Sequence, residues 1–171
     1  MLSGAGHRRH RGAWILVSSG LVSESEVGVG EVKIREATEG DVEALANLMT
    51  ELGYPSKVEE MSRRFEGISA DPSYGTLVAE RDGRVVGMAG AHLQRTYEAN
   101  GEVARIMSFV VGSEERGQGV GRALISAVED WARRRNAAEI MLTTHKRRAG
   151  AHEFYRRMGY DHTGYRFYKE L

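Results

Sequence analysis

The segment from Glu114 to Leu124 reads EERGQGVGRAL and has glycines at 117, 119 and 121, directly before an apolar pattern of helical spacing. Glycine leaves the backbone bare, so a ligand can approach its N–H group closely. The first N–H groups of a helix have no partner within the helix and attract anions. These residue types and their spacing therefore predict a loop that binds a phosphate or pyrophosphate, with Arg116 at its start.

Two common nucleotide-binding loops do not fit this segment. A P-loop ends in Gly-Lys-Ser or Gly-Lys-Thr, whereas Gly121 is followed by Arg122 and Ala123. A dinucleotide-binding loop that began at Gly117 would need its third glycine at position 122, where Arg122 stands. From these residues alone, a glycine-rich turn that binds nothing is the alternative.

A second motif, AHEFYRRMGY, runs from Ala151 to Tyr160. Arg116, Gly119 and Gly121 match the R/Q-x-x-G-x-G/A motif of the GNAT superfamily of N-acetyltransferases, and the second motif resembles a later segment of that family. The chain resembles the family from about Val32 to Leu171. The stretches DGRVVGMAGAHLQ and YRFYKEL are similar to those of bacterial aminoalkylphosphonate and other small-amine N-acetyltransferases.

This resemblance implies a fold and a cosubstrate. The fold would be a single α/β domain over residues 32–171, with a mixed β-sheet flanked by helices and splayed between its fourth and fifth strands. The cosubstrate would be acetyl-coenzyme A (acetyl-CoA), with its pyrophosphate on the loop and its pantetheine arm along the fourth strand. The residues expected to bind it are Phe109, Val110, Val111, Arg116, Gly117, Gln118, Gly119, Val120, Gly121 and Arg122.

Amide formation from a thioester needs a neutral amine, stabilisation of the developing oxyanion and a proton for the departing thiolate. Because the chain has no cysteine, a thiol relay is excluded, and direct transfer in a ternary complex is the expected mechanism. A backbone N–H between Phe109 and Val111 is expected to polarise the thioester carbonyl. Tyr155 stands at the family's Phe-Tyr position and is the expected proton donor.

The general base is less sharply defined by the sequence. Many relatives place a glutamate on the fourth strand, but Arg105 and Ser108 stand in that region here. Glu102, acting through a water, and His145 are the catalytic candidates, and His92 is a further one. An ordinary structural role for each is the alternative, as is an amine that loses its proton in solution without a base.

The acceptor is expected to be a small primary amine that enters between the first two helices and the hairpin. Tyr54, His92, Arg95 and Arg105 are expected to contact it, the arginines through an acidic group such as a phosphonate. Two alternatives stay open: an acetyltransferase for a protein lysine or N-terminus, and a non-catalytic domain that binds acyl-CoA as a sensor. Members of the family often pair, so a homodimer is the assembly that the resemblance suggests.

The composition excludes several other classes. Lys+Arg and Asp+Glu both count 24, whereas a nucleic-acid-binding protein should carry a surplus of positive charge. No apolar run approaches the roughly 20 residues of a membrane span. Without cysteine there are no disulfides or zinc-thiolate sites, and we expect a cytoplasmic protein with no metal. Ser, Gly and Glu dominate from Ser18 to Glu31, and we expect residues 1–31 to be a disordered extension.

Periodicity predicts the elements that would position these residues, in the order β-α-α-β-β-β-α-β-α-β. Capping boxes formed by Thr38 with Asp41 and by Ser56 with Glu59 are expected to begin the first two helices. The dipeptide Asp82-Gly83 predicts a hairpin turn. Further strands are expected at 102–112, 139–145 and 165–171, and further helices at 119–135 and 149–159.

Overall fold

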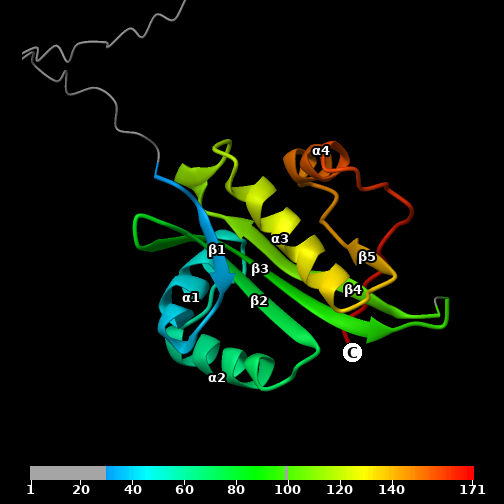
Figure 1. Cartoon of the computed structure of the whole chain (residues 1–171), viewed down its shortest axis with the longest axis horizontal. Helices are drawn as coiled ribbons and strands as arrows, with labels where there is room; N and C mark the ends of the chain where they lie inside the picture. The colour runs from blue at the N-terminus through cyan, green and yellow to red at the C-terminus, as the bar shows by residue number, and fades with distance from the viewer. Residues whose placement is uncertain (1–29, 99) are drawn as a thin grey trace, which may run out of the picture.

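The computed structural model of the chain describes residues 30–98 and 100–171 (Figure 1). Of the expected N-terminal extension, residues 1–29 therefore lie outside the described residues. The strands are β1 (Lys33–Glu36), β2 (Tyr74–Arg81), β3 (Arg84–Arg95), β4 (Glu102–Val111) and β5 (Glu139–Leu142). The helices are α1 (Val42–Glu51), α2 (Val58–Ser69), α3 (Val120–Arg134) and α4 (Ala149–Arg157), with short 3₁₀ helices η1 (Glu39–Asp41) and η2 (Ser113–Glu115).

The five strands form one sheet in the order β1-β2-β3-β4-β5. Neighbours from β1 to β4 are antiparallel, whereas β5 runs parallel to β4. Asp82 and Gly83 join β2 to β3 with φ angles of 50° and 74°, as a tight hairpin turn with two left-handed residues requires. The predicted single α/β domain with a mixed sheet is confirmed.

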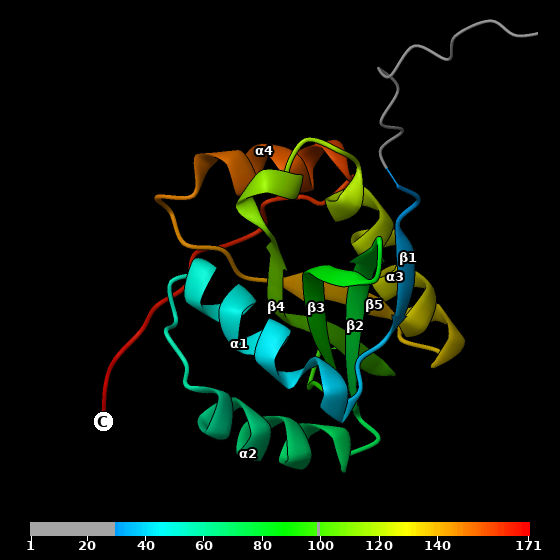
Figure 2. The ribbon, with the colours of Figure 1, turned by 90° about the vertical axis from the view of Figure 1, so that its left-hand side faces the viewer.

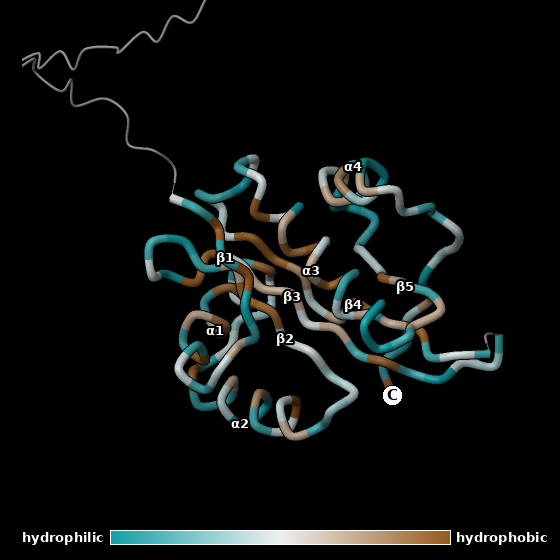
Figure 3. The backbone as a smooth tube through the Cα atoms, in the orientation of Figure 1, coloured by the Kyte–Doolittle hydropathy of each residue, from teal (hydrophilic) through white to brown (hydrophobic). Residues whose placement is uncertain are grey.

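Helices cover both faces of the sheet. Helices α1 and α2 lie on one side and α3 on the other (Figure 2). Leu124, Val128 and Trp131 of α3 are fully buried against the sheet. The other core cluster joins α1 and α2 to strand residues such as Val78 and Met88. Apolar residues accordingly gather on the central strands and on α3 (Figure 3), and this packing fixes which face of β4 each side chain occupies.

The sheet opens between β4 and β5, as the resemblance implied. Strand β5 pairs with β4 only from Val103 to Ile106, where Leu142 lies opposite Ile106. From Met107 to Val111, no strand among the described residues lies beside β4 on that side. At the same point β4 contains a β-bulge, because Gly90 pairs with Ser108 and Ala91 with Ile106, so that Met107 is the extra residue.

The prediction of a last strand at 165–171 is wrong. Residues 160–171 form no regular element, and Tyr165, Phe167 and Tyr168 are 88%, 94% and 76% exposed. The alternation of YRFYKEL is typical of a strand, but an alternating pattern does not supply a neighbouring strand to accept its backbone hydrogen bonds. The strand predicted at 139–145 also ends early, at Leu142.

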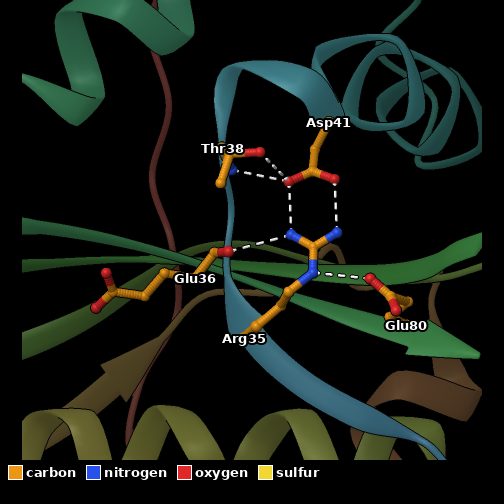
Figure 4. A network of polar contacts seen from close by, with 5 residues as sticks. All are labelled: Arg35, Glu36, Thr38, Asp41 and Glu80. Atoms are coloured by element: carbon orange, nitrogen blue, oxygen red, sulfur yellow. Dashed lines mark hydrogen bonds and ion pairs between the residues drawn. The ribbon is translucent and has the colours of Figure 1, made fainter. Parts of the chain in front are cut away.

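A polar network joins β1, β2 and the start of α1. Arg35 donates two hydrogen bonds to the carboxylate of Asp41, at 2.7 and 2.8 Å, and one to Glu80 at 2.8 Å (Figure 4). The backbone N–H of Thr38 donates to the Asp41 carboxylate at 2.8 Å. This confirms the part of the first predicted capping box in which the Asp41 side chain caps the backbone of Thr38. The second box is displaced by one residue, since Lys57 is the N-cap of α2 and its N–H donates to Glu60.

Candidate active site

The loop between β4 and α3 presents an open backbone. Gly117 and Gly119 have φ angles of 77° and 84°, which glycine adopts without strain. A Cβ atom added at either residue would meet nothing within 4 Å. Gly119 is the N-cap of α3, and no described side chain caps this helix start. The first N–H groups of α3 are therefore open to an anionic ligand such as a phosphate or pyrophosphate.

Arg81, the last residue of β2, is hydrogen-bonded to two side chains of this loop. Its side chain is only 5% exposed, and its Nη1 donates to the carboxylate of Glu115 and, at 2.7 Å, to Oε1 of Gln118. The Gln118 amide in turn donates from Nε2 to the carbonyl of Glu114 at 2.8 Å. One buried guanidinium thus neutralises a carboxylate of the loop and fixes the side chain of Gln118.

Glu51, the last residue of α1, also contacts the segment between β4 and α3. Its carboxylate accepts a hydrogen bond from the backbone N–H of Ser113 at 2.9 Å and lies 3.8 Å from Arg116. Arg116 also donates from Nε to the carbonyl of Val111 at 3.0 Å. Arg116 therefore braces the loop in this structure, and the Val111 carbonyl already has a partner. Arg122 lies exposed on α3.

The open edge of β4 offers main-chain rather than side-chain contacts to a ligand. Val110 is buried against α1 and α2. Phe109 packs on the opposite face, with its ring centroid 5.8 Å from that of Phe154 and 6.0 Å from that of Tyr155. The backbone of this strand is what remains for an extended ligand in the splay, as when a peptide adds to a sheet edge.

Tyr155 lies on α4, in a cluster of aromatic rings beside the splay. Its ring is edge-on to those of Phe109, Phe154 and Tyr160, with centroids 6.0, 5.2 and 5.7 Å away. Burial raises the pKa of the Tyr155 hydroxyl to about 12, and the positive charge of Arg148 acts against this rise. The phenol is therefore protonated at neutral pH, but it is a weaker acid than an exposed tyrosine.

The three candidate bases lie in different places. His92 is on β3, half-buried, directly opposite Arg105 of β4. Because His92 and Gly90 are two residues apart on one face, about 7 Å along a strand, His92 lies close to the bulge. Its ring stacks on Tyr74 with centroids 4.3 Å apart.

Glu102 and His145 are placed less favourably for proton transfer at the bulge. Glu102 begins β4, opposite Arg95, five residues or about 17 Å of strand from Met107. Glu102 also alternates with Arg105, so their side chains point to opposite faces. His145 is exposed after β5, and its Nδ1 accepts a hydrogen bond from the N–H of Arg147 at 3.1 Å, so one of its two ring nitrogens is already engaged.

The structure also separates the predicted acceptor-binding residues into two that lie together and two that lie elsewhere. His92 and Arg105 are brought together on paired strands, on the sheet face that α1 and α2 cover. Arg95 lies exposed at the far end of the hairpin. Tyr54 is 59% exposed just after α1. Nearby, Arg148 donates to the carbonyl of Leu52 at 2.6 Å, so it joins the end of α1 to the start of α4.

Several residues of the site were not predicted. Met107 was missed because a bulge depends on the partner strand, and Arg81 and Glu51 because their partners in the loop are far away in sequence. In the chain as described, no helix has the length and apolarity to cross a membrane. The same residues include no group of three His, Cys, Asp or Glu side chains arranged to hold a metal.

Comparison with known families matches residues 42–160 to the acetyltransferase (GNAT) family. Among curated proteins, the chain is 33% identical over 142 residues to aminoalkylphosphonate N-acetyltransferase of Salmonella typhimurium, covering 81% of this chain and 91% of that protein. It is 29% identical over 134 residues to aminoglycoside N(6')-acetyltransferase type 1 of Stenotrophomonas maltophilia, covering 76% and 86%.

Solved structures show the same fold. The aminoglycoside N-acetyltransferase AAC(6')-Iy, determined in complex with CoA, superposes with a TM-score of 0.75 over 88% of this chain and 99% of its own. Its sequence identity to this chain is 19%, so this likeness concerns the fold alone.

Proposed function

The chain belongs to the acetyltransferase (GNAT) family, and from this premise we propose that it transfers an acetyl group directly, in a ternary complex, to a small primary amine that carries an acidic group. That it is an N-acetyltransferase acting on amines, with acetyl-CoA as the cosubstrate, follows from its family and relatives. The acceptor, the direct transfer and the residue roles below are the proposed part.

One observation carries the proposal: two features of the molecule meet at the bulge of β4. The first is the open edge of β4 from Met107 to Val111, which continues into the glycine loop. The second is the pair formed by His92 and Arg105 on the face toward α1 and α2. A thioester held along the edge and an amine held near this pair would approach each other at Met107. Bulges frequently occur next to active sites, because they redirect backbone groups.

The roles proposed for the chain's own residues follow from this arrangement. The thioester of acetyl-CoA supplies the acetyl group when bound. A backbone N–H freed by the bulge would donate to the developing oxyanion, which typically stabilises a transition state by ~3 kcal/mol. His92 would take a proton from the amine, directly or through one water. Tyr155 would return a proton to the thiolate, since its hydroxyl is protonated at neutral pH.

Arg105 supports the choice of an acidic acceptor. Arg105 is half-buried and lies directly opposite His92 on the paired strands, and arginine binds phosphonate or carboxylate through two parallel hydrogen bonds. The relative from Salmonella typhimurium acts, by its name, on aminoalkylphosphonates. The relative from Stenotrophomonas maltophilia acts, by its name, on aminoglycosides, which are cationic. An experiment must therefore compare acceptors with and without an acidic group.

The test is release of free CoA thiol from acetyl-CoA with matched amines. The panel contains aminomethylphosphonate, glycine, methylamine, an aminoglycoside and a lysine peptide. We expect kcat/KM to be highest for the phosphonate and to fall at least tenfold in Arg105→Met for that amine only. His92→Gln should lower kcat. Preference for the aminoglycoside or the peptide would overturn the acidic acceptor, and CoA binding without turnover of any amine would favour the sensor.

A further inference from the structure

A small apolar cavity lies beneath the β4 bulge, on the face toward α1 and α2. Its volume is about 80 Å³. Its inner wall consists of the apolar side chains Leu45, Met61, Phe65, Ile68 and Met88. All of these except Ile68 are buried, so the wall belongs to the core that α1 and α2 form with the sheet.

The mouth of the cavity lies at the bulge. Met107 and Ser108 of β4 line it there, together with Gly90 of β3. Met107 is 53% exposed, so the cavity opens beside a side chain at the surface. Tyr74 and Thr76 of β2 also line the cavity. Tyr74 stacks on His92, which connects the mouth to the pair proposed to bind the amine.

The chemistry of this cavity selects an uncharged aliphatic group. Among the described residues that line it, none is charged. A buried ion without a partner is strongly disfavoured, so the ammonium and the acidic group of an acceptor must stay outside, near His92 and Arg105. An apolar cavity of roughly 150 Å³ holds the six carbons of benzene, so about half that volume holds about three carbons.

We propose that this cavity is a specificity pocket for a short alkyl substituent of the acceptor amine, with an optimum near three carbons. The inference rests on the proposed function, because it assumes that the amine is acetylated at the bulge. Each methylene that leaves water for the pocket improves kcat/KM by about fourfold. Once the pocket is full, a longer chain collides with the packed core and kcat/KM falls.

Gly90 offers a way to shrink the pocket without disturbing the fold. A Cβ atom on Gly90 would lie 3.9 Å from Cβ of Ser108, which is ordinary contact, and the residue does not have positive φ. Gly90→Ala therefore adds one methyl group to the lining. Met107→Ala does the reverse, since it removes an exposed side chain from the mouth. Gly67→Ala, on the exposed side of α2 with nothing within 4 Å of its new Cβ atom, is the matched control.

The experiment measures kcat/KM for 1-aminoalkylphosphonates whose alkyl group grows from hydrogen to pentyl. Wild type and Gly67→Ala should rise to a maximum at about propyl and then decline. Gly90→Ala should reach its maximum one carbon earlier, and Met107→Ala should tolerate longer chains. A flat series, or the same optimum in Gly90→Ala, overturns the pocket even if every amine is acetylated.

A second readout separates this inference from the proposed function. If none of the amines is acetylated, the proposed function fails, but the pocket is still tested by the rise in Tm that each amine causes in the presence of CoA. Tm shifts that follow alkyl length in wild type, with an earlier maximum in Gly90→Ala, support the pocket. Tm shifts independent of alkyl length contradict it.

Discussion

The ring of Tyr155 lies edge-on to the ring of Phe109, with centroids 6.0 Å apart and planes inclined at 62°. This contact joins α4 to the part of β4 that, among the described residues, has no strand on the side away from β3. The hydroxyl that is proposed to protonate the leaving thiolate is thus carried by a ring packed directly against the strand proposed to hold the thioester. The position of the Tyr155 hydroxyl relative to the thioester therefore depends on how α4 packs against β4.

Tyr155→Phe should lower kcat by about 100-fold or more, because general acids typically contribute that much, while the KM for acetyl-CoA changes little. The phenyl ring keeps the contacts with Phe109 and Phe154, so Tm should stay close to wild type. Since the pKa of Tyr155 is about 12, the wild-type kcat should not fall between pH 8 and pH 10. Steady-state kinetics over this range test both statements, and a wild-type kcat in the mutant would assign Tyr155 to packing alone.

Arg81→Met should raise the KM for acetyl-CoA about tenfold with little change in kcat. The substitution removes hydrogen bonds from a charged donor, typically worth about 1.5–3 kcal/mol. It also leaves Glu115, a carboxylate of the loop, without its buried cation. A dianionic pyrophosphate would then meet uncompensated negative charge.

Adding Glu115→Gln to Arg81→Met distinguishes this electrostatic effect from loss of structure. The double variant no longer carries the negative charge, so its KM for acetyl-CoA should return part of the way to the wild-type value. The increase in KM of the single variant over wild type should be larger at low salt than at high salt, because salt screens the charge. If the two variants have the same KM at every salt concentration and differ only in Tm, Arg81 acts on folding rather than on the ligand.

Asp41→Asn should lower the free energy of unfolding by about 1–2 kcal/mol at pH 7. The bonds from Arg35 hold the pKa of Asp41 at about 2, below its usual 3.8. A carboxyl whose pKa is depressed by folding stabilises the protein above its unfolded pKa, and this contribution is lost as pH falls through the folded pKa. The difference between wild type and mutant should therefore shrink as pH falls from 5 to 2.

Urea unfolding at several pH values measures that difference. Asp130→Asn is the control, since Asp130 also binds an arginine, Arg133 at 2.7 Å, but is 58% exposed. Exposed pairs contribute only a few tenths of a kcal/mol. An Asp41→Asn penalty that is constant with pH would mean that packing, rather than the charge of Asp41, is responsible.

The features predictable from sequence were those that depend on nearby residues. Two left-handed residues at Asp82-Gly83 and the bare loop at Gly117 and Gly119 follow from local conformational preferences. The contact of Arg81 with Gln118 spans 37 positions and depends on how β2 and the loop pack together. The bulge at Met107 is a property of two strands, not one. The tail at 165–171 shows the converse, since its strand-like alternation has no partner among the described residues.

Gly119→Ala should raise the KM for acetyl-CoA, whereas Gly83→Ala should not. The two glycines are matched: their φ angles are 84° and 74°, and a new Cβ atom would meet nothing within 4 Å at either residue. Both substitutions therefore incur the same left-handed backbone strain of about 1–2 kcal/mol, and Tm should fall equally. Only at Gly119, the N-cap of α3, would the methyl group stand where an anion approaches the helix N–H groups. Equal KM values in the two variants would show that the pyrophosphate binds elsewhere.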